Sequence, residues 1–196
     1  MQTSYIQQDK IINWLRANLD KERFEHSIGT SETAVELAEL FKLDKEKACI
    51  AGLIHDCAKC LPPEELKRIL NEEKTACSDI GSNKTLHAPA GAILAKKIFG
   101  ITDDEILSAI RWHTVGKLGM SNFDKIIFIA DKIEAKTRPQ EYINYIKPYL
   151  YQDNGLDRAM LQSFKATIKS LVDRELVICN SSIEIYNELI KKYEKN

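Results

Sequence analysis

Histidine is scarce in this chain, and the four histidines, together with two aspartates, are the residues best suited to chemistry. These residues are His26, His55, His87, His113, Asp56 and Asp131. Most of their neighbours are small or apolar residues, and Asp131 follows Ile127-Phe128-Ile129-Ala130 directly. Neutral imidazole and carboxylate groups are natural ligands of iron, manganese, cobalt and zinc. The pattern therefore predicts a metal site.

The spacing of these residues indicates what kind of metal site to expect. Only His55 and Asp56 are adjacent, and the other separations are too long for local chelation, so several helices must contribute. A lone histidine in an apolar helix is usually a core residue, but a carboxylate buried as Asp131 would be needs a metal or a partner charge. Six ligands exceed what one divalent ion normally takes from protein, so we expect two ions that share a carboxylate.

The elements that must position these ligands are helices. Apolar residues recur with helical spacing, as at Ala34, Leu37 and Phe41, and Thr102 and Glu105 have the spacing of a helix-capping box. No segment alternates like a strand. The fold class is therefore predicted to be all-α, a single-domain helical bundle with helices at residues 4–18, 22–41, 45–57, 63–73, 87–98, 103–113, 121–135, 140–150, 154–176 and 182–194.

Chain length and composition indicate one domain. The chain has 196 residues, of which 44% are hydrophobic and 29% charged, as in an ordinary globular protein with a real core. We expect residues 1–196 to form one unit, with the core motifs at 23–135 and C-terminal helices at 140–194 packed on it. The small and polar residues of segment 74–86 predict a loop near the opening of the site.

Charge, hydropathy and cysteine content exclude several classes of protein. The net charge of −1 argues against general electrostatic binding of nucleic acid. No apolar run reaches the roughly 18 residues of a membrane span, and the N-terminus lacks a signal-peptide pattern. The odd number of cysteines, five, favours a reducing compartment over a disulfide framework. We therefore expect a cytoplasmic protein that binds neither membrane nor nucleic acid.

Five segments in order resemble the motifs of a known family. The order His…His-Asp…His…His…Asp resembles the HD-domain superfamily of metal-dependent phosphohydrolases, and the segments together resemble its YqeK family. They are RFEHSIGT at 23–30, GLIHDCAK at 52–59, LHAPAGA at 86–92, IRWHTVG at 110–116 and ADKIE at 130–134. The resemblance covers residues 10–190. Ala135 departs from it, since many relatives have a proline there, but this should matter little for the ligands.

The resemblance implies a di-iron hydrolase that cleaves diadenosine tetraphosphate symmetrically into two ADP, with a metal-bound hydroxide as nucleophile. Manganese, cobalt or zinc would suit the same ligand types. By analogy with the superfamily, the first ion would be held by His26, His55, Asp56 and Asp131, and the second by Asp56, His87 and His113.

Further residues near these motifs are candidates for handling the substrate. Lys59 follows Asp56 by three positions and is expected to place its ammonium on a phosphate oxygen, so both are predicted to be catalytic. Thr114 and Gly116 are candidates for phosphate binding through a hydroxyl and a backbone N–H, and Arg138 for bidentate binding. Each of them also has an ordinary explanation as a helix-end or turn residue.

Cysteines and tyrosines give weaker signals. Cys57 and Cys60 have the spacing of a redox or zinc motif, but no second pair exists, so both are interpreted as incidental thiols. The tyrosines at 142, 145, 149 and 151 are expected to serve packing or a subunit contact, which leaves a homodimer as an alternative to a monomer.

Other functions are compatible with the same residues. Proteins of the HD type also include phosphohydrolases of other nucleotides and phosphodiesterases, between which a fold cannot choose. A nucleotide-sensing protein with slow turnover would keep the same metal pocket. Turnover of bound nucleotide in the presence of metal distinguishes this last alternative from an enzyme.

Overall fold

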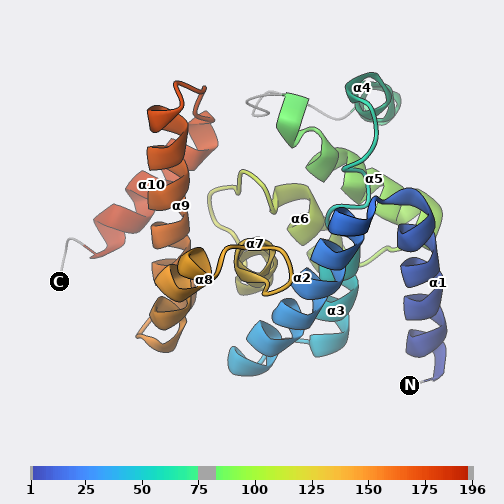
Figure 1. Cartoon of the computed structure of the whole chain (residues 1–196), viewed down its shortest axis with the longest axis horizontal. Coiled ribbons are helices and arrows are strands. Elements are labelled where there is room, and N and C mark those ends of the chain that lie inside the picture. Colours follow the sequence, from blue (N-terminus) through green and yellow to red (C-terminus); the bar gives the residue numbers. More distant parts are fainter. Residues whose placement is uncertain (1, 75–82, 194–196) are drawn as a thin grey trace.

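The computed structural model describes residues 2–74 and 83–193, apart from the side chains of residues 2–7 and 83. In that part of the chain every regular element is a helix (Figure 1). The helices are α1 (Gln2–Asn18), α2 (Lys21–Leu40), α3 (Lys45–Ile54), α4 (Pro63–Glu72), η1 (Asn83–Thr85), α5 (His87–Phe99), α6 (Asp104–Trp112), α7 (Asn122–Ile133), α8 (Gln140–Ile146), η2 (Lys147–Tyr151), α9 (Gly155–Asp173) and α10 (Asn180–Tyr193). The expected all-α class is confirmed.

Helix α7 lies at the centre of the bundle. Its residues Ile126, Ile127 and Ile129 are fully buried, and a helix that is apolar on most sides must be enclosed by other helices. Helices α2, α6 and α9 all pack against it (Figure 1). Asp131, near the C-terminal end of α7, is thereby held inside the protein.

Helices α2 and α3 approach each other so closely that their interface requires glycine. A Cβ atom at Gly52 would lie 2.6 Å from the Cα of Ser31. The Ser31 hydroxyl donates a hydrogen bond of 2.9 Å to the carbonyl of Cys49 across the same interface. This close packing brings His26 of α2 next to His55, which follows α3.

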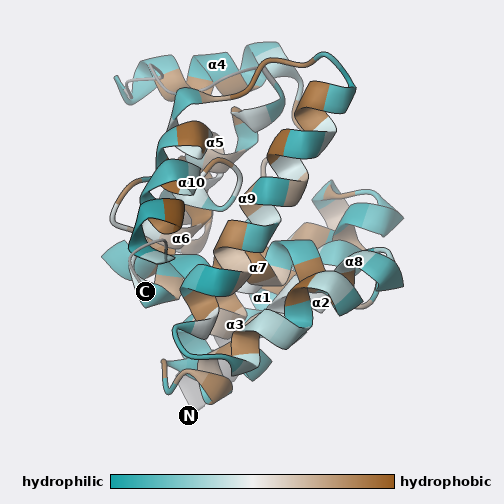
Figure 2. Cartoon of the chain, turned by 90° about the vertical axis from the view of Figure 1, so that its left-hand side faces the viewer, coloured by the Kyte–Doolittle hydropathy of each residue, from teal (hydrophilic) through white to brown (hydrophobic). Residues whose placement is uncertain are grey.

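The C-terminal helices pack on the far side of α7. Apolar and polar residues alternate around α9 and α10, as expected for helices with one buried side (Figure 2). Phe164 of α9 stacks on Phe128 of α7 with 5.0 Å between ring centroids. Asp157, near the start of α9, pairs with Lys125 of α7 at 2.6 Å and with Lys192 of α10 at 2.5 Å.

Three predicted boundaries differ from the structure for local reasons. The helix predicted over 45–57 ends at Ile54, and turns follow it. The helix predicted over 140–150 ends at Ile146 and continues as a 3-10 helix, because Pro148 has no N–H to donate. The cap of α6 is Asp103 rather than Thr102, and its carboxylate accepts from two backbone N–H groups of the first turn.

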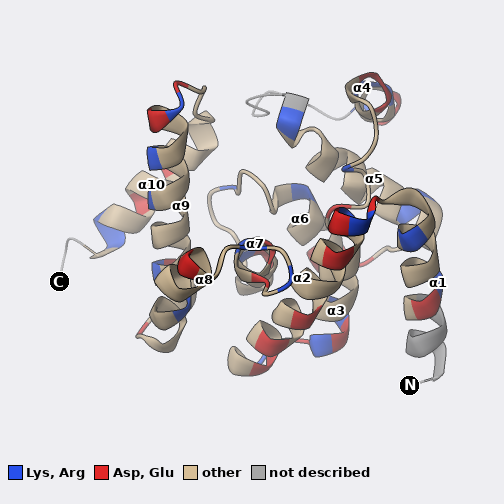
Figure 3. Cartoon of the chain, viewed as in Figure 1, with Lys and Arg blue, Asp and Glu red and all other residues tan. Residues whose placement is uncertain are grey.

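The predicted loop over 74–86 is described only at its two ends. Residues 83–85 form η1, and residues 75–82 lie outside the described residues. Lysine, arginine, aspartate and glutamate residues are distributed along the described helices (Figure 3). None of these helices is long and apolar enough to cross a lipid bilayer.

Candidate metal centre

Five helices bring the six predicted ligands together. Four of the six ligands lie at helix ends rather than in mid-helix: His55 and Asp56 follow α3, His113 follows α6 and His87 opens α5. Only His26 of α2 and Asp131 of α7 lie within helices. All six are buried, with exposed fractions from 0% to 8%. The structure thus brings every predicted ligand to one buried place.

Two groups of metal-ligand type share one carboxylate. The first group is His26, His55 and Asp56, and the second is Asp56, His87 and His113, with the ligand atoms of each group within 4.8 Å of one another. Asp56 Oδ2 lies 3.9 Å from Nε2 of both His26 and His55. Asp56 Oδ1 lies 3.1 Å from His87 Nε2 and 3.3 Å from His113 Nε2. Each oxygen therefore serves a different group, as a bridging ligand would.

Asp131 lies beside the first group. Its Oδ1 is 3.0 Å from His26 Nε2 and 3.7 Å from His55 Nε2. The first group thus has two histidines and two carboxylates around it, and the second has two histidines and Asp56; this is the grouping that the family resemblance implies.

Backbone carbonyls orient three of the histidines. The Nδ1 atoms of His55 and His113 donate to the carbonyls of Gly52 and Ile110, each at 2.7 Å. A helix leaves its last carbonyls without intrahelical partners, and these two imidazoles fill that need at the ends of α3 and α6. His87 Nδ1 donates to the Lys84 carbonyl at 2.9 Å. Since a carbonyl only accepts, Nδ1 carries the proton in each case, and Nε2 keeps its lone pair.

His26 is oriented by a carboxylate that the sequence analysis did not identify as a site residue. Glu134 is fully buried, and its Oε1 lies 3.1 Å from His26 Nδ1. The backbone N–H groups of Lys136 and Thr137 donate to the same carboxylate, which fixes its position. A Cβ atom at Gly29 would lie 2.2 Å from Glu134 Oε2, so this glycine leaves room for the carboxylate. Glu134 ends the ADKIE motif, but its place in that motif does not reveal its contact with His26.

The donor set fits divalent ions. His26 Nε2 and His55 Nε2 lie 3.2 Å apart, and His87 Nε2 and His113 Nε2 lie 3.3 Å apart. With the protons on Nδ1, lone pairs face lone pairs and the Asp56 carboxylate, and buried Asp56 Oδ1 has no hydrogen-bond donor among the described residues. A buried carboxylate oxygen without a donor, among converging imidazole lone pairs, is costly unless a cation lies beside it.

The pKa values of the buried groups follow from these contacts. Burial alone would raise the pKa of Asp56, but its electrostatic interaction with His55 and its contacts with His113 and His87 hold the pKa well below its ordinary value. Asp131 also has a pKa well below its ordinary value, because Lys132 and the bonds to His26 and His55 outweigh burial. Burial lowers the pKa of His113 to about 4. Ionised carboxylates and a neutral His113 are the forms that metal ligands require.

Cationic side chains border the ligands. Lys59 Nζ lies 3.1 Å from His87 Nε2 and 4.0 Å from Asp56 Oδ1, and burial lowers its pKa. Arg138 donates to Asp131 Oδ1 at 2.6 Å. Arg23, which was not predicted as a site residue, lies 3.6 Å from Asp56 Oδ2. The predicted residues Lys59 and Arg138 are therefore at the centre.

The structure gives a different result for Thr114 and Gly116, the other two residues predicted to bind phosphate. The Gly116 N–H already donates to the carbonyl of Trp112 at 2.9 Å, and its Cα faces Ile185 and Phe164 at a φ of 72°. Glycine is favoured there by the backbone conformation and the close packing, and the N–H is not available for phosphate. The hydroxyl of Thr114 is buried without a hydrogen-bond partner in the described part of the chain.

The two cysteines next to the site differ in environment. Cys57 is buried with its thiol 3.7 Å from the Gly91 carbonyl, and burial raises its pKa to about 12. Cys60 is exposed. A thiol with so high a pKa is a poor nucleophile, which agrees with the interpretation of Cys57 as an incidental thiol.

The chain is similar to several known proteins. Residues 23–136 match the HD domain family. The chain is 37% identical over 177 residues to a Bacillus subtilis protein named "Bis(5'-nucleosyl)-tetraphosphatase, symmetrical", covering 90% of this chain and 94% of the relative. A Staphylococcus aureus protein of the same name is 31% identical, covering 88% and 89%. The crystal structure of a predicted HD superfamily hydrolase involved in NAD metabolism from Clostridium acetobutylicum is 42% identical, with a TM-score of 0.87 over 94% of this chain and 97% of that one.

Proposed function

The chain belongs to the HD domain family, and we propose that it is a metal-dependent hydrolase that cleaves diadenosine tetraphosphate symmetrically into two ADP. The observation that carries this proposal is the pair of histidine groups joined by Asp56. The fold alone would not select a substrate. The names of the Bacillus and Staphylococcus relatives support the choice, since these proteins match nearly the whole chain.

The proposed ligand sets follow from the two groups. One ion would be held by His26, His55, Asp56 and Asp131, and the other by Asp56, His87 and His113. Bound divalent ions would act as Lewis acids toward phosphate and lower the pKa of a water molecule. Iron is the metal that we propose, and manganese, cobalt and zinc suit the same ligand types.

The cations beside the ligands support a polyphosphate substrate. Lys59, Arg23 and Arg138 surround Asp56 and Asp131, so the rim carries more positive charge than the two carboxylates neutralise. Lys59 is proposed to stabilise charge that grows on a phosphate oxygen during the reaction. Arg138 and the Thr114 hydroxyl are proposed to bind phosphate in the ground state.

The proposed reaction balances without a general acid. The oxygen of a water molecule forms a bond to one of the two central phosphorus atoms, and the bond from that phosphorus to the central bridging oxygen breaks. The two protons of the water molecule pass to solvent, and the second half leaves as ADP, whose phosphate is a stable anion. Attack must occur in line with the leaving oxygen.

Hydrolysis in ¹⁸O-labelled water tests the proposal. We expect ADP as the main product of the metal-loaded protein, with one label in the β-phosphate of one ADP of each pair. AMP and ATP as main products would contradict symmetrical cleavage. The absence of turnover, despite tight binding of nucleotide and metal, would favour the nucleotide-sensing alternative.

Cellular location and oligomeric state are also proposals. We propose a cytoplasmic protein, which the odd number of cysteines in the sequence supports. A homodimer remains a prediction from the tyrosine-rich segment, in which Tyr145 and Tyr151 are exposed. Sedimentation equilibrium over a range of concentrations tests the latter.

A further inference from the structure

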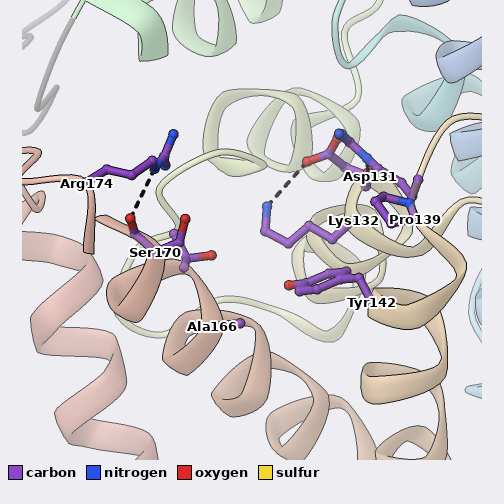
Figure 4. Close-up of a pocket in the computed structure, with 9 residues that line it drawn as sticks. Asp131, Lys132, Pro139, Tyr142, Ala166, Ser170 and Arg174 are labelled. Carbon is purple, nitrogen blue, oxygen red and sulfur yellow. Dashed lines mark hydrogen bonds and ion pairs between the residues drawn. The ribbon is translucent and has the colours of Figure 1, made fainter. Parts of the chain in front are cut away.

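A cleft of about 480 Å³ lies next to Asp131, between the α7–α8 region and α9 (Figure 4). Its volume lies in the range of roughly 300–1,000 Å³ that is usual for small-molecule sites. Its lining includes Asp131, Lys132, Arg138, Tyr142, Ser170 and Arg174. All of these except Asp131 and Lys132 lie beyond residue 136, where the match to the HD domain ends. The cleft is therefore built mainly by the C-terminal part of the chain.

One end of the cleft opens on the proposed metal ligands. Arg138 donates to Asp131 Oδ1 at 2.6 Å, and its Nη2 also lies 3.3 Å from His26 Nε2. Its Nε donates to the Asp131 carbonyl at 2.7 Å, which fixes the guanidinium group at this end. A molecule bound in the cleft can therefore directly reach the residues proposed to bind the metals.

The cleft combines cations on both walls with an aromatic ring. Lys132 Nζ lies 3.3 Å from Asp131 Oδ2 and 4.0 Å from the Phe128 ring centroid. Arg174 lies on the opposite wall, where its Nε donates to the Ser170 carbonyl at 3.0 Å (Figure 4). The half-buried ring of Tyr142 lies between the two walls, below Lys132 (Figure 4). Three cations face one carboxylate, so the cleft has a positive surplus.

We propose that this cleft binds one nucleoside diphosphate half of the substrate, which rests on the function proposed above. Arg138, Lys132 and Arg174 bind the phosphates, because guanidinium and ammonium groups complement phosphate oxygens. The Tyr142 ring packs against the base, since every base offers a flat face for stacking. Under this proposal α8 and α9 select a nucleotide for the metal ligands that α2, α3, α5, α6 and α7 position.

Equilibrium binding of ADP to the metal-loaded protein, measured by calorimetry, tests the cleft without turnover. We expect Arg174→Ala and Tyr142→Ala each to weaken ADP binding by about tenfold, within the range for losing a stacked ring or a charged partner. Tyr142→Phe should bind ADP like the wild type, because it keeps the ring. Lys169→Ala is the matched control, since this exposed lysine of α9 pairs with Asp173 and does not line the cleft.

Kinetics separate this proposal from the function on which it rests. Arg174→Ala and Tyr142→Ala should each raise KM for diadenosine tetraphosphate and leave the metal content unchanged. If both bind ADP within twofold of the wild type while the wild type cleaves symmetrically, the cleft proposal is wrong and the proposed function stands. If the wild type does not cleave this substrate but ADP binding still depends on Arg174 and Tyr142, the cleft stands and the proposed function is wrong.

Discussion

At the scale of single residues, what matters most is where each imidazole proton sits. Three histidines donate hydrogen bonds from Nδ1 to backbone carbonyls, and no side-chain substitution removes those carbonyls. His26 donates its Nδ1 hydrogen bond to the Glu134 carboxylate instead. The first histidine group is therefore the one that a substitution at Glu134, which is not itself a proposed metal ligand, can disturb.

Asp56 is the residue whose loss should be most severe. Asp56→Ala removes the carboxylate that both groups share, so we expect it to abolish activity and lower metal content at both positions. His55→Ala and Asp131→Ala should be nearly as severe. Elemental analysis of protein purified without chelator should give about two metal equivalents for the wild type, as in a two-metal site. Full activity of metal-free protein in chelator would contradict the two-metal centre.

Glu134→Ala should weaken metal binding without removing a ligand. Carboxylates that orient metal-binding histidines typically contribute about 10–100-fold to affinity, and we expect a loss of that size in chelator competition. Glu134→Gln should lose less, because its amide oxygen can still accept from His26 Nδ1. The ¹⁵N shifts of His26 should report a changed tautomer, and Glu141→Ala, on the exposed side of α8, is the control. Unchanged affinity and unchanged shifts would show that Glu134 is merely structural.

Lys59→Ala should slow turnover and spare the metals. Loss of one preorganised group that stabilises transition-state charge typically costs about 10²-fold or more in kcat, and we expect about 10²-fold. Single-turnover rates and metal analysis check both halves of this prediction. Cys60→Ser, one position along and exposed, should be nearly silent. A Cys60→Ser protein that is folded but as inactive as Asp56→Ala would overturn the interpretation of this thiol.

At the scale of helices, the site depends on how closely α2 approaches α3. The Gly52 backbone lies against Ser31, and any side chain there would separate the two helices that carry His26 and His55. In α5 the environment of Gly91 is different, since an added Cβ would find its nearest neighbour at 3.5 Å. These two buried glycines therefore form a matched pair.

Gly52→Ala should destabilise the protein, whereas Gly91→Ala should not. Overpacking a rigid interface costs about 1–3 kcal/mol, and we expect a loss of that size for Gly52→Ala in urea unfolding. Gly91→Ala should change stability by less than about 1 kcal/mol and can increase it, because alanine restricts the unfolded chain. Equal stability of the two variants would mean that the α2–α3 approach can relax.

At the scale of the whole molecule, one carboxylate ties the C-terminal helices to the centre. Asp157 of α9 is buried and pairs with Lys125 of α7 and Lys192 of α10. Burial alone would raise the pKa of Asp157, but the two lysines lower it below its ordinary value. These pairs hold α9 and α10 on the side of α7 where the nucleotide cleft is proposed.

Asp157→Asn should change how stability depends on pH. Because the pKa of Asp157 is lowered in the folded protein, its contribution is present above the ordinary value of 3.8 and is lost as pH falls through the lowered value. We expect a loss of about 1–2 kcal/mol at pH 7, between exposed and buried ion pairs. The difference between variant and wild type should shrink toward pH 3 in unfolding experiments. A constant difference at all pH values would assign the effect to packing.

Much of this protein follows from local sequence. Helical spacing of apolar residues predicts the helices of the described region to within a few residues, and the interruption at Pro148 has a local cause. The six residues brought together at the site were all identified from their types and their apolar surroundings. Lys59 and Arg138 could also be named, because they are close in sequence to Asp56 and Asp131.

Only the tertiary structure decided which atoms meet. Glu134 reaches His26 across 108 positions of sequence, and no local pattern distinguishes such a carboxylate from a surface charge. The residue type of Gly116 suits a phosphate-binding turn. In the structure, however, its N–H donates a hydrogen bond to the Trp112 carbonyl and its Cα faces the core. The cleft beside Asp131 likewise needs α7, α8 and α9 in contact. Periodicity and residue type are local, whereas the partner of a buried polar atom is set by the packing of distant helices.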